Sequence, residues 1–62
     1  MSPRISVRCG LIKVDGLVRG HYKRMELVGY EFLFDGWRHY QQQHSDIKGA
    51  VYRILQRQRE QA

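Results

Sequence analysis

The amino-terminal part of the chain alternates between apolar and polar positions. In residues 5–11, apolar side chains are separated by Ser, Arg and Gly, which is the period of a half-buried strand. Asp15-Gly16 follows this run, and the pair accepts the positive φ angles of a two-residue type I′ turn. We therefore expect one continuous strand up to this turn. The chain would double back there, with Val14 facing Leu17.

The period of two then fixes the predicted cross-strand partners and faces. Ile12 is expected opposite Arg19, Cys9 opposite Tyr22, and Val7 opposite Arg24. One face would carry Ile5, Val7, Cys9, Leu11, Val18 and Tyr22. Gly10 and Gly20 interrupt the pattern, and glycine inside a strand often marks a bulge or a close approach of two backbones.

A second hairpin is predicted in the stretch FLFDGWRHY, residues 32–40. Asp35-Gly36 would join a strand near 30–34 to another near 37–42. The expected pairs are Phe34 with Trp37, Phe32 with His39, and Tyr30 with Gln41. The aromatic density of these pairs favours their face as the core side, so Trp37 is expected inside. The other face would carry Glu31, Leu33, Arg38 and Tyr40.

From Ser45 onward the spacing becomes helical. The apolar positions are Ile47, Ala50, Val51, Ile54 and Leu55, with Lys48, Arg53, Gln56 and Arg57 on the opposite side. Ser45 is a candidate N-cap, and Asp46 suits the positive end of the helix dipole. Gly49 costs a helix up to about 1 kcal/mol relative to Ala, a cost explained if the helix backbone passes close to the sheet.

These elements predict a single α+β domain over residues 1–62. An antiparallel sheet of three or four strands would carry one carboxy-terminal helix packed across it. The expected core is Val7, Leu11, Val18, Tyr30, Phe32, Phe34, Trp37, Ile47, Val51, Ile54 and Leu55. A domain of 62 residues hides only about 60% of the surface that its unfolded chain exposes. We therefore expect a homodimer, formed through an unpaired strand edge or through the apolar stripe of the helix.

Charge and cysteine content narrow the class of protein. Eleven Lys and Arg stand against six Asp and Glu, a formal charge of +5, and this favours a polyanionic partner. Cys9 is the only cysteine, and no apolar run approaches the roughly 20 residues of a membrane helix. With no amino-terminal apolar run, these features indicate a cytoplasmic protein without a membrane partner.

Two kinds of chemistry have candidate residues but weak patterns. Cys9, His21, His39 and His44 could ligate zinc, but they lack the two closely spaced ligand pairs of a structural zinc site. His39, His44, Arg38 and Tyr40 are the candidates for acid-base work. In the predicted register His39 projects from one face while Arg38 and Tyr40 project from the other, so they diverge. We predict neither an enzyme nor a cofactor or metal.

Nucleic-acid binding is the leading functional prediction. Cations alternate with aromatic and glutamine residues in RGHYKR (19–24) and WRHYQQQH (37–44), a combination that can contact phosphates, base edges and unpaired bases. The predicted contact residues are Arg19, Lys23, Arg24, Arg38 and Tyr40. DNA is favoured over RNA, in a small regulatory protein of the kind that phages and plasmids carry. Two alternatives stay open: a basic face that binds an acidic surface of a larger complex, and a merely solvated face whose cations prevent edge-to-edge pairing.

Residues 29–55, GYEFLFDGWRHYQQQHSDIKGAVYRIL, resemble part of two families of DNA-binding domain. These are the arm-type binding domain of phage and transposon integrases and the plant AP2 domain. In both, a strand, a turn with Gly, a basic strand and an amphipathic helix follow in this order, and the sheet enters the major groove. The resemblance implies DNA contact through Arg38, Tyr40 and either Lys23 or Arg24. The long hairpin before residue 29 departs from the family pattern.

Overall fold

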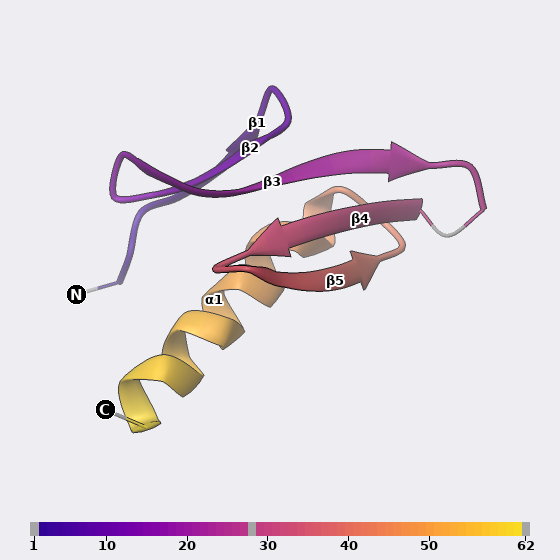
Figure 1. The fold of residues 1–62 in the computed structure, drawn as a ribbon. Coiled ribbons are helices and arrows are strands. Elements are labelled where there is room, and N and C mark those ends of the chain that lie inside the picture. The colour runs from indigo at the N-terminus through magenta and orange to yellow at the C-terminus, as the bar shows by residue number, and fades with distance from the viewer. Residues whose placement is uncertain (1, 28, 62) are drawn as a thin grey trace.

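Five strands follow one another along the chain, and a helix closes it (Figure 1). The structure is a computed structural model that describes residues 2–27 and 29–61. The elements are β1 (Ile5–Arg8), β2 (Leu11–Val14), β3 (Leu17–Met25), β4 (Gly29–Phe34), β5 (Trp37–Gln41) and α1 (Ser45–Gln61). Each strand pairs antiparallel with the next, in the order β1-β2-β3-β4-β5. The predicted α+β fold is confirmed, with five strands where three or four were expected.

Three two-residue turns of the same kind connect the strands. φ is positive at both residues of Asp15-Gly16 (53° and 84°) and of Asp35-Gly36 (52° and 84°), as a type I′ turn requires. The third turn is Cys9-Gly10, with φ of 53° and 76°. Both Asp-Gly predictions are confirmed, whereas the turn at Cys9 was not anticipated.

The unexpected turn makes the predicted register of the first hairpin wrong. Residues 5–14 form two strands, so Val7 lies opposite Ile12 instead of Arg24, and Cys9 lies in the turn instead of opposite Tyr22. A two-residue turn also reverses which positions share a face. Ile12 and Val14 therefore join Ile5 and Val7 on the core side.

Strand β3 joins two halves of the sheet. Its first part pairs with β2 over residues 17–21, and its second part pairs with β4 over residues 20–25. An irregularity next to Ile12 places Gly20, not Arg19, opposite that residue. A Cβ atom on Gly20 would come within 2.0 Å of the Leu33 carbonyl oxygen, so only glycine permits this close approach of β3 to β4.

The helix covers one face of the sheet, and the core lies between them (Figure 1). Among the described residues, the buried apolar side chains come from β1, β2, β4 and α1. They are Ile5, Ile12, Val14, Phe32, Phe34, Ile47, Ala50, Val51 and Leu55. Val7, Tyr22, Tyr30 and Ile54 are partly buried against this cluster. The apolar stripe of the helix is thus used within the chain and is not available as a dimer surface.

Three residues of the predicted core are exposed. Leu11 and Val18 lie on the face away from the helix, because Leu11 pairs with His21 and Val18 with Lys13 in the shifted register. Trp37 does pair with Phe34 as predicted, yet its side chain is 74% exposed. The core draws no fully buried residue from β5 in the described part of the chain. The expectation that Trp37 is a core residue is therefore wrong.

The helix begins at Ser45, and four of its five predicted apolar positions, Ile54 being the exception, are buried. The explanation offered for Gly49 is wrong. A Cβ atom at this position would find only the end of the Arg53 side chain, 3.9 Å away. Gly49 therefore lies in open space on the exposed side of the helix and does not touch the sheet.

Candidate nucleic-acid interface

The face of the sheet opposite the helix carries a mixture of cations and apolar side chains. We call it the outer face, and the register assigns twelve strand residues to it. They are Ser6, Arg8, Leu11, Lys13, Val18, His21, Lys23, Met25, Glu31, Leu33, Arg38 and Tyr40. Four of these side chains are cationic and one is acidic. The predicted grouping of Glu31, Leu33, Arg38 and Tyr40 is confirmed.

Glu31 lies between two cations at the centre of the outer face. Arg38 Nε lies 2.8 Å from Glu31 Oε1, and Lys23 Nζ lies 3.8 Å from Glu31 Oε2. The Glu31 side chain is only 13% exposed, whereas that of Arg38 is 62% exposed. The carboxylate is thus paired with an arginine whose side chain stays largely open to solvent.

A small depression of about 150 Å³ lies over this group, lined by His21, Lys23, Glu31, Leu33 and Arg38. Its donors are the Lys23 ammonium and the Arg38 guanidinium, and its floor includes the Leu33 side chain. Such a site suits a phosphate oxygen or another small anionic group, because Arg and Lys donate to anions and accept nothing.

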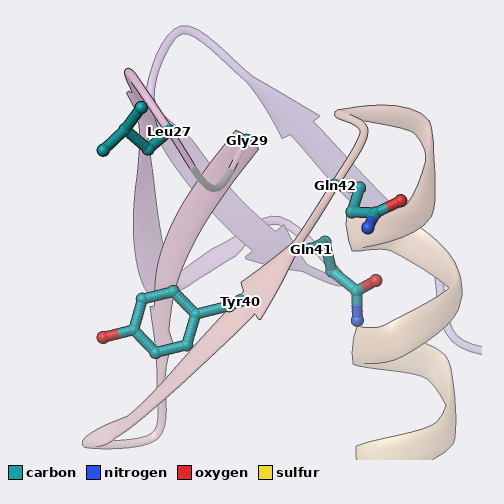
Figure 2. A pocket seen from close by; sticks show the side chains of 5 residues that line it. All are labelled: Leu27, Gly29, Tyr40, Gln41 and Gln42. Carbon is teal, nitrogen blue, oxygen red and sulfur yellow. The ribbon is translucent and has the colours of Figure 1, made fainter.

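Tyr40 extends the outer face toward the end at which β3 turns into β4. It lies opposite Glu31 and is more than half exposed. With Leu27, Gly29, Gln41 and Gln42 it lines a second, open depression. Figure 2 shows that the Tyr40 ring and the Leu27 side chain lie on one side of this depression, while the Gln41 and Gln42 side chains lie on the other. A flat ring of this exposure can stack on a base or on an apolar side chain.

Arg19 does not belong to the outer face group. Its Nε donates to Asp35 Oδ1 at 3.1 Å, and a second nitrogen forms an ion pair with Asp35 Oδ2. Gln58 of the helix completes the cluster by donating to Asp35 Oδ2 at 2.9 Å. The Arg19 guanidinium carbon also lies 5.0 Å from the centre of the Phe34 ring. These contacts give Arg19 a structural role in linking β3, the β4–β5 turn and α1.

Arg24 lies on the side that faces the helix, because it pairs with Tyr30 and Tyr30 packs against the core. The predicted set is therefore divided: Lys23, Arg38 and Tyr40 share the outer face, while Arg19 and Arg24 lie elsewhere. Arg8 and Lys13, which were not predicted, do lie on the outer face. Their alternation with Val7 and Ile12 would have placed them there, had the Cys9-Gly10 turn been recognised.

The sheet separates the two histidines considered for acid-base chemistry from Arg38 and Tyr40. His39 stacks on Phe32, with ring centres 4.9 Å apart, on the face opposite Arg38 and Tyr40. His44 Nε2 lies 3.1 Å from the Tyr22 hydroxyl, and its ring meets those of Tyr22 and Tyr30 edge-on. These contacts make both imidazoles part of the aromatic packing beside the helix.

Neither a metal centre nor a helix able to cross a membrane is found over residues 2–27 and 29–61. No three His, Cys, Asp or Glu side chains in this part come close enough together to hold a metal ion. Cys9 is exposed at its turn, and His39 is half-buried in the aromatic packing. In this part of the chain, helix α1 is not long and apolar enough to cross a membrane.

Comparisons of this chain with protein-family models, curated proteins and solved structures found no match.

Proposed function

We propose that this protein binds nucleic acid, in the first place duplex DNA, through the outer face of its sheet. The observation that carries the proposal is the uncovered basic face. It carries cations at positions 8, 13, 23 and 38 and one carboxylate, Glu31, which is ion-paired with Lys23 and Arg38. A polyanion that approaches this face meets an excess of positive charge and no unpaired acid among the described strand residues.

The mixed chemistry of the outer face supports DNA as the ligand. Arg38 pairs with Glu31 through Nε, so its two terminal nitrogens can donate to phosphate oxygens or to a guanine edge. Lys23 can neutralise a phosphate as a mobile point charge. Leu33 and Tyr40 offer apolar contact to the sugar or to a thymine methyl group.

Neighbouring residues on opposite faces provide a matched test. Lys23→Ala and Arg24→Ala remove the same charge from adjacent positions, but only Lys23 lies on the outer face. Binding is measured by fluorescence anisotropy with duplex and single-stranded oligonucleotides at several salt concentrations. Lys23→Ala and Arg38→Ala should weaken binding and each reduce the log-log salt slope by about 0.9 for a lost phosphate contact. Arg24→Ala should leave the slope unchanged.

A substitution of the opposite sign completes the test. Glu31→Gln removes the negative charge from the outer face, so it should strengthen binding at low salt. Circular dichroism establishes that each variant is folded. Absence of binding by the folded wild type at low salt contradicts the proposal, and so does an equal loss in Lys23→Ala and Arg24→Ala, because that result would indicate attraction by net charge alone.

A protein partner with an acidic surface is the second candidate, favoured by Leu27. Its side chain is 96% exposed beside Tyr40, and exposed apolar anchors are typical of protein interfaces. For this function Leu27→Ala should reduce partner binding more than Lys23→Ala does. For DNA binding the order should be reversed.

A further inference from the structure

The free edge of β5 presents backbone groups with no partner in the described chain. β5 is the last strand of the sheet. Because Phe34 and Trp37 flank a two-residue turn, residues 37, 39 and 41 exchange hydrogen bonds with β4. The N–H and C=O groups of Arg38 and Tyr40 therefore point away from the sheet.

The opposite edge, at β1, is flanked by other parts of the chain. Ile5 and Pro3 line a common depression with Lys48, Tyr52 and Arg53 of the helix. A proline and overhanging charged side chains are means by which proteins protect strand edges. β5 contains no proline, and Trp37 at its start is 74% exposed. Of the two edges, β5 is therefore the one more open to pairing with another strand.

We propose that β5 pairs antiparallel with β5 of a second copy of this chain, about a two-fold axis at His39. In this register Arg38 of each copy lies opposite Tyr40 of the other, so every outward N–H and C=O of these residues is paired. An arginine across from an exposed tyrosine ring is a favourable pair. An axis at Arg38 would oppose two arginines, which is unfavourable. An axis at Tyr40 would pair Arg38 with Gln42, beyond the end of the strand.

The same register places Trp37 of one copy across from Gln41 of the other, on the side facing the helices. Trp37 would then lose much of its exposure to water. This explains why a large apolar side chain is tolerated at an otherwise open position. The dimer is isologous, as closed two-fold interfaces are.

The DNA-binding consequence depends on the proposed function. Two paired β5 strands form a ribbon of the kind that the major groove of B-DNA admits. Arg38 and Tyr40 of both copies would lie on its outer face. Lys23, two strands away and thus about 10 Å to the side, would lie toward the phosphates. The ligand of the dimer is then duplex DNA with a two-fold symmetric site.

Amide hydrogen exchange without nucleic acid tests the dimer directly. NMR exchange rates are compared at low micromolar and near-millimolar protein, with sedimentation on the same samples. Protection at the N–H groups of Arg38 and Tyr40 should rise with concentration. The outward N–H groups of Ile5 and Val7 on β1 are the internal control and should not change. A monomer at near-millimolar concentration, or a dimer protected at β1 instead, overturns the proposal.

Two lysine substitutions at equivalent positions make the test specific. Trp37 and Leu17 each follow an Asp-Gly turn and are 74% and 70% exposed, but only Trp37 lies on the free edge. Trp37→Lys should weaken dimerisation by about tenfold or more, since it removes the apolar contact and guards the edge. Leu17→Lys should not affect dimerisation. Equal effects would refute the β5 interface. If the protein dimerises through β5 but does not bind DNA, only the proposed function is refuted. If it binds DNA as a monomer, only the β5 dimer is refuted.

Discussion

The Asp15-Gly16 and Asp35-Gly36 turns have almost the same backbone and very different surroundings. φ differs by no more than 1° between equivalent residues. The Asp15 carboxylate accepts one hydrogen bond, from the Arg4 backbone N–H at 3.0 Å. The Asp35 carboxylate instead binds Arg19 from β3 and Gln58 from the helix. The first turn is thus secured locally, and the second is a tertiary junction.

The comparison shows what a turn motif specifies and what it leaves open. Asp-Gly determines the reversal and the first pair of each hairpin, because both depend on local φ angles. How firmly the turn is held depends on side chains distant in sequence. Arg19 and Asp35 are 16 residues apart, and Gln58 is a further 23 away.

The largest expected effect is at Gly20, where the two hairpins share β3. Gly20→Ala would place a methyl group 2.0 Å from the Leu33 carbonyl oxygen. Backbone atoms cannot yield as a flexible side chain does, so we expect a loss of about 3 kcal/mol or more in the free energy of unfolding. Chemical denaturation followed by circular dichroism measures this loss.

Gly49→Ala is the matched control. It adds the same methyl group in open space on the helix and should stabilise the protein by up to about 1 kcal/mol. If both alanine variants have the stability of the wild type, β3 and β4 do not approach each other as described.

The turns themselves give the next effect. Gly16 and Gly36 both have φ of 84°, and a Cβ atom at either would touch nothing within 4 Å. Only backbone strain opposes a side chain there, so Gly16→Val and Gly36→Val should each cost about 2 kcal/mol. The two costs should be equal despite the different surroundings, as measured by thermal denaturation.

Asparagine provides the control at both positions because it tolerates this backbone region. Gly16→Asn and Gly36→Asn should retain most of the stability lost in the valine variants. Unchanged melting midpoints in both valine variants would contradict the two type I′ turns. A much larger loss at one turn would show that strain there extends into the tertiary contacts.

The carboxy-terminal half of the fold was predictable because its signals are local and redundant. Asp35-Gly36, the alternation on both sides of it and the change to helical spacing at Ser45 all indicate one arrangement. The pairing of Phe32 with His39 followed directly. The exposure of Trp37 could not be predicted in this way, because it depends on which strands the helix covers.

The amino-terminal half was less predictable because its decisive turn has an atypical residue. Cys9 adopts a φ of 53°, which Asn and Asp adopt far more often. The missed turn put Leu11 and Val18 on the wrong face, whereas the irregularity next to Ile12 returns Tyr22 to the predicted side. The shared face of Arg38 and Tyr40 could be predicted from the second hairpin, whereas Arg8 and Lys13 of the first hairpin were missed.

The smallest predicted effect is a pH-dependent contribution of Asp35 to stability. The hydrogen bond from Arg19 lowers the pKa of Asp35 below its ordinary value of 3.8, against a smaller opposing effect of burial. A carboxyl with a lowered pKa in the folded state stabilises the protein above its unfolded pKa. That stabilisation is lost as the pH falls through the folded pKa. Asp35→Asn should therefore cost about 1 kcal/mol at pH 7, the magnitude of a partly exposed ion pair, and much less near pH 2.

Asp15→Asn is the control for this prediction. Its amide oxygen can still accept the Arg4 N–H, and asparagine tolerates the turn conformation. This variant should therefore have nearly the stability of the wild type at pH 7, measured by urea denaturation, which also follows Asp35→Asn at each pH. If the gap between Asp35→Asn and the wild type is as large at pH 2 as at pH 7, the charge of Asp35 does not stabilise the junction. The variant would then report only the altered hydrogen bonds to Arg19 and Gln58.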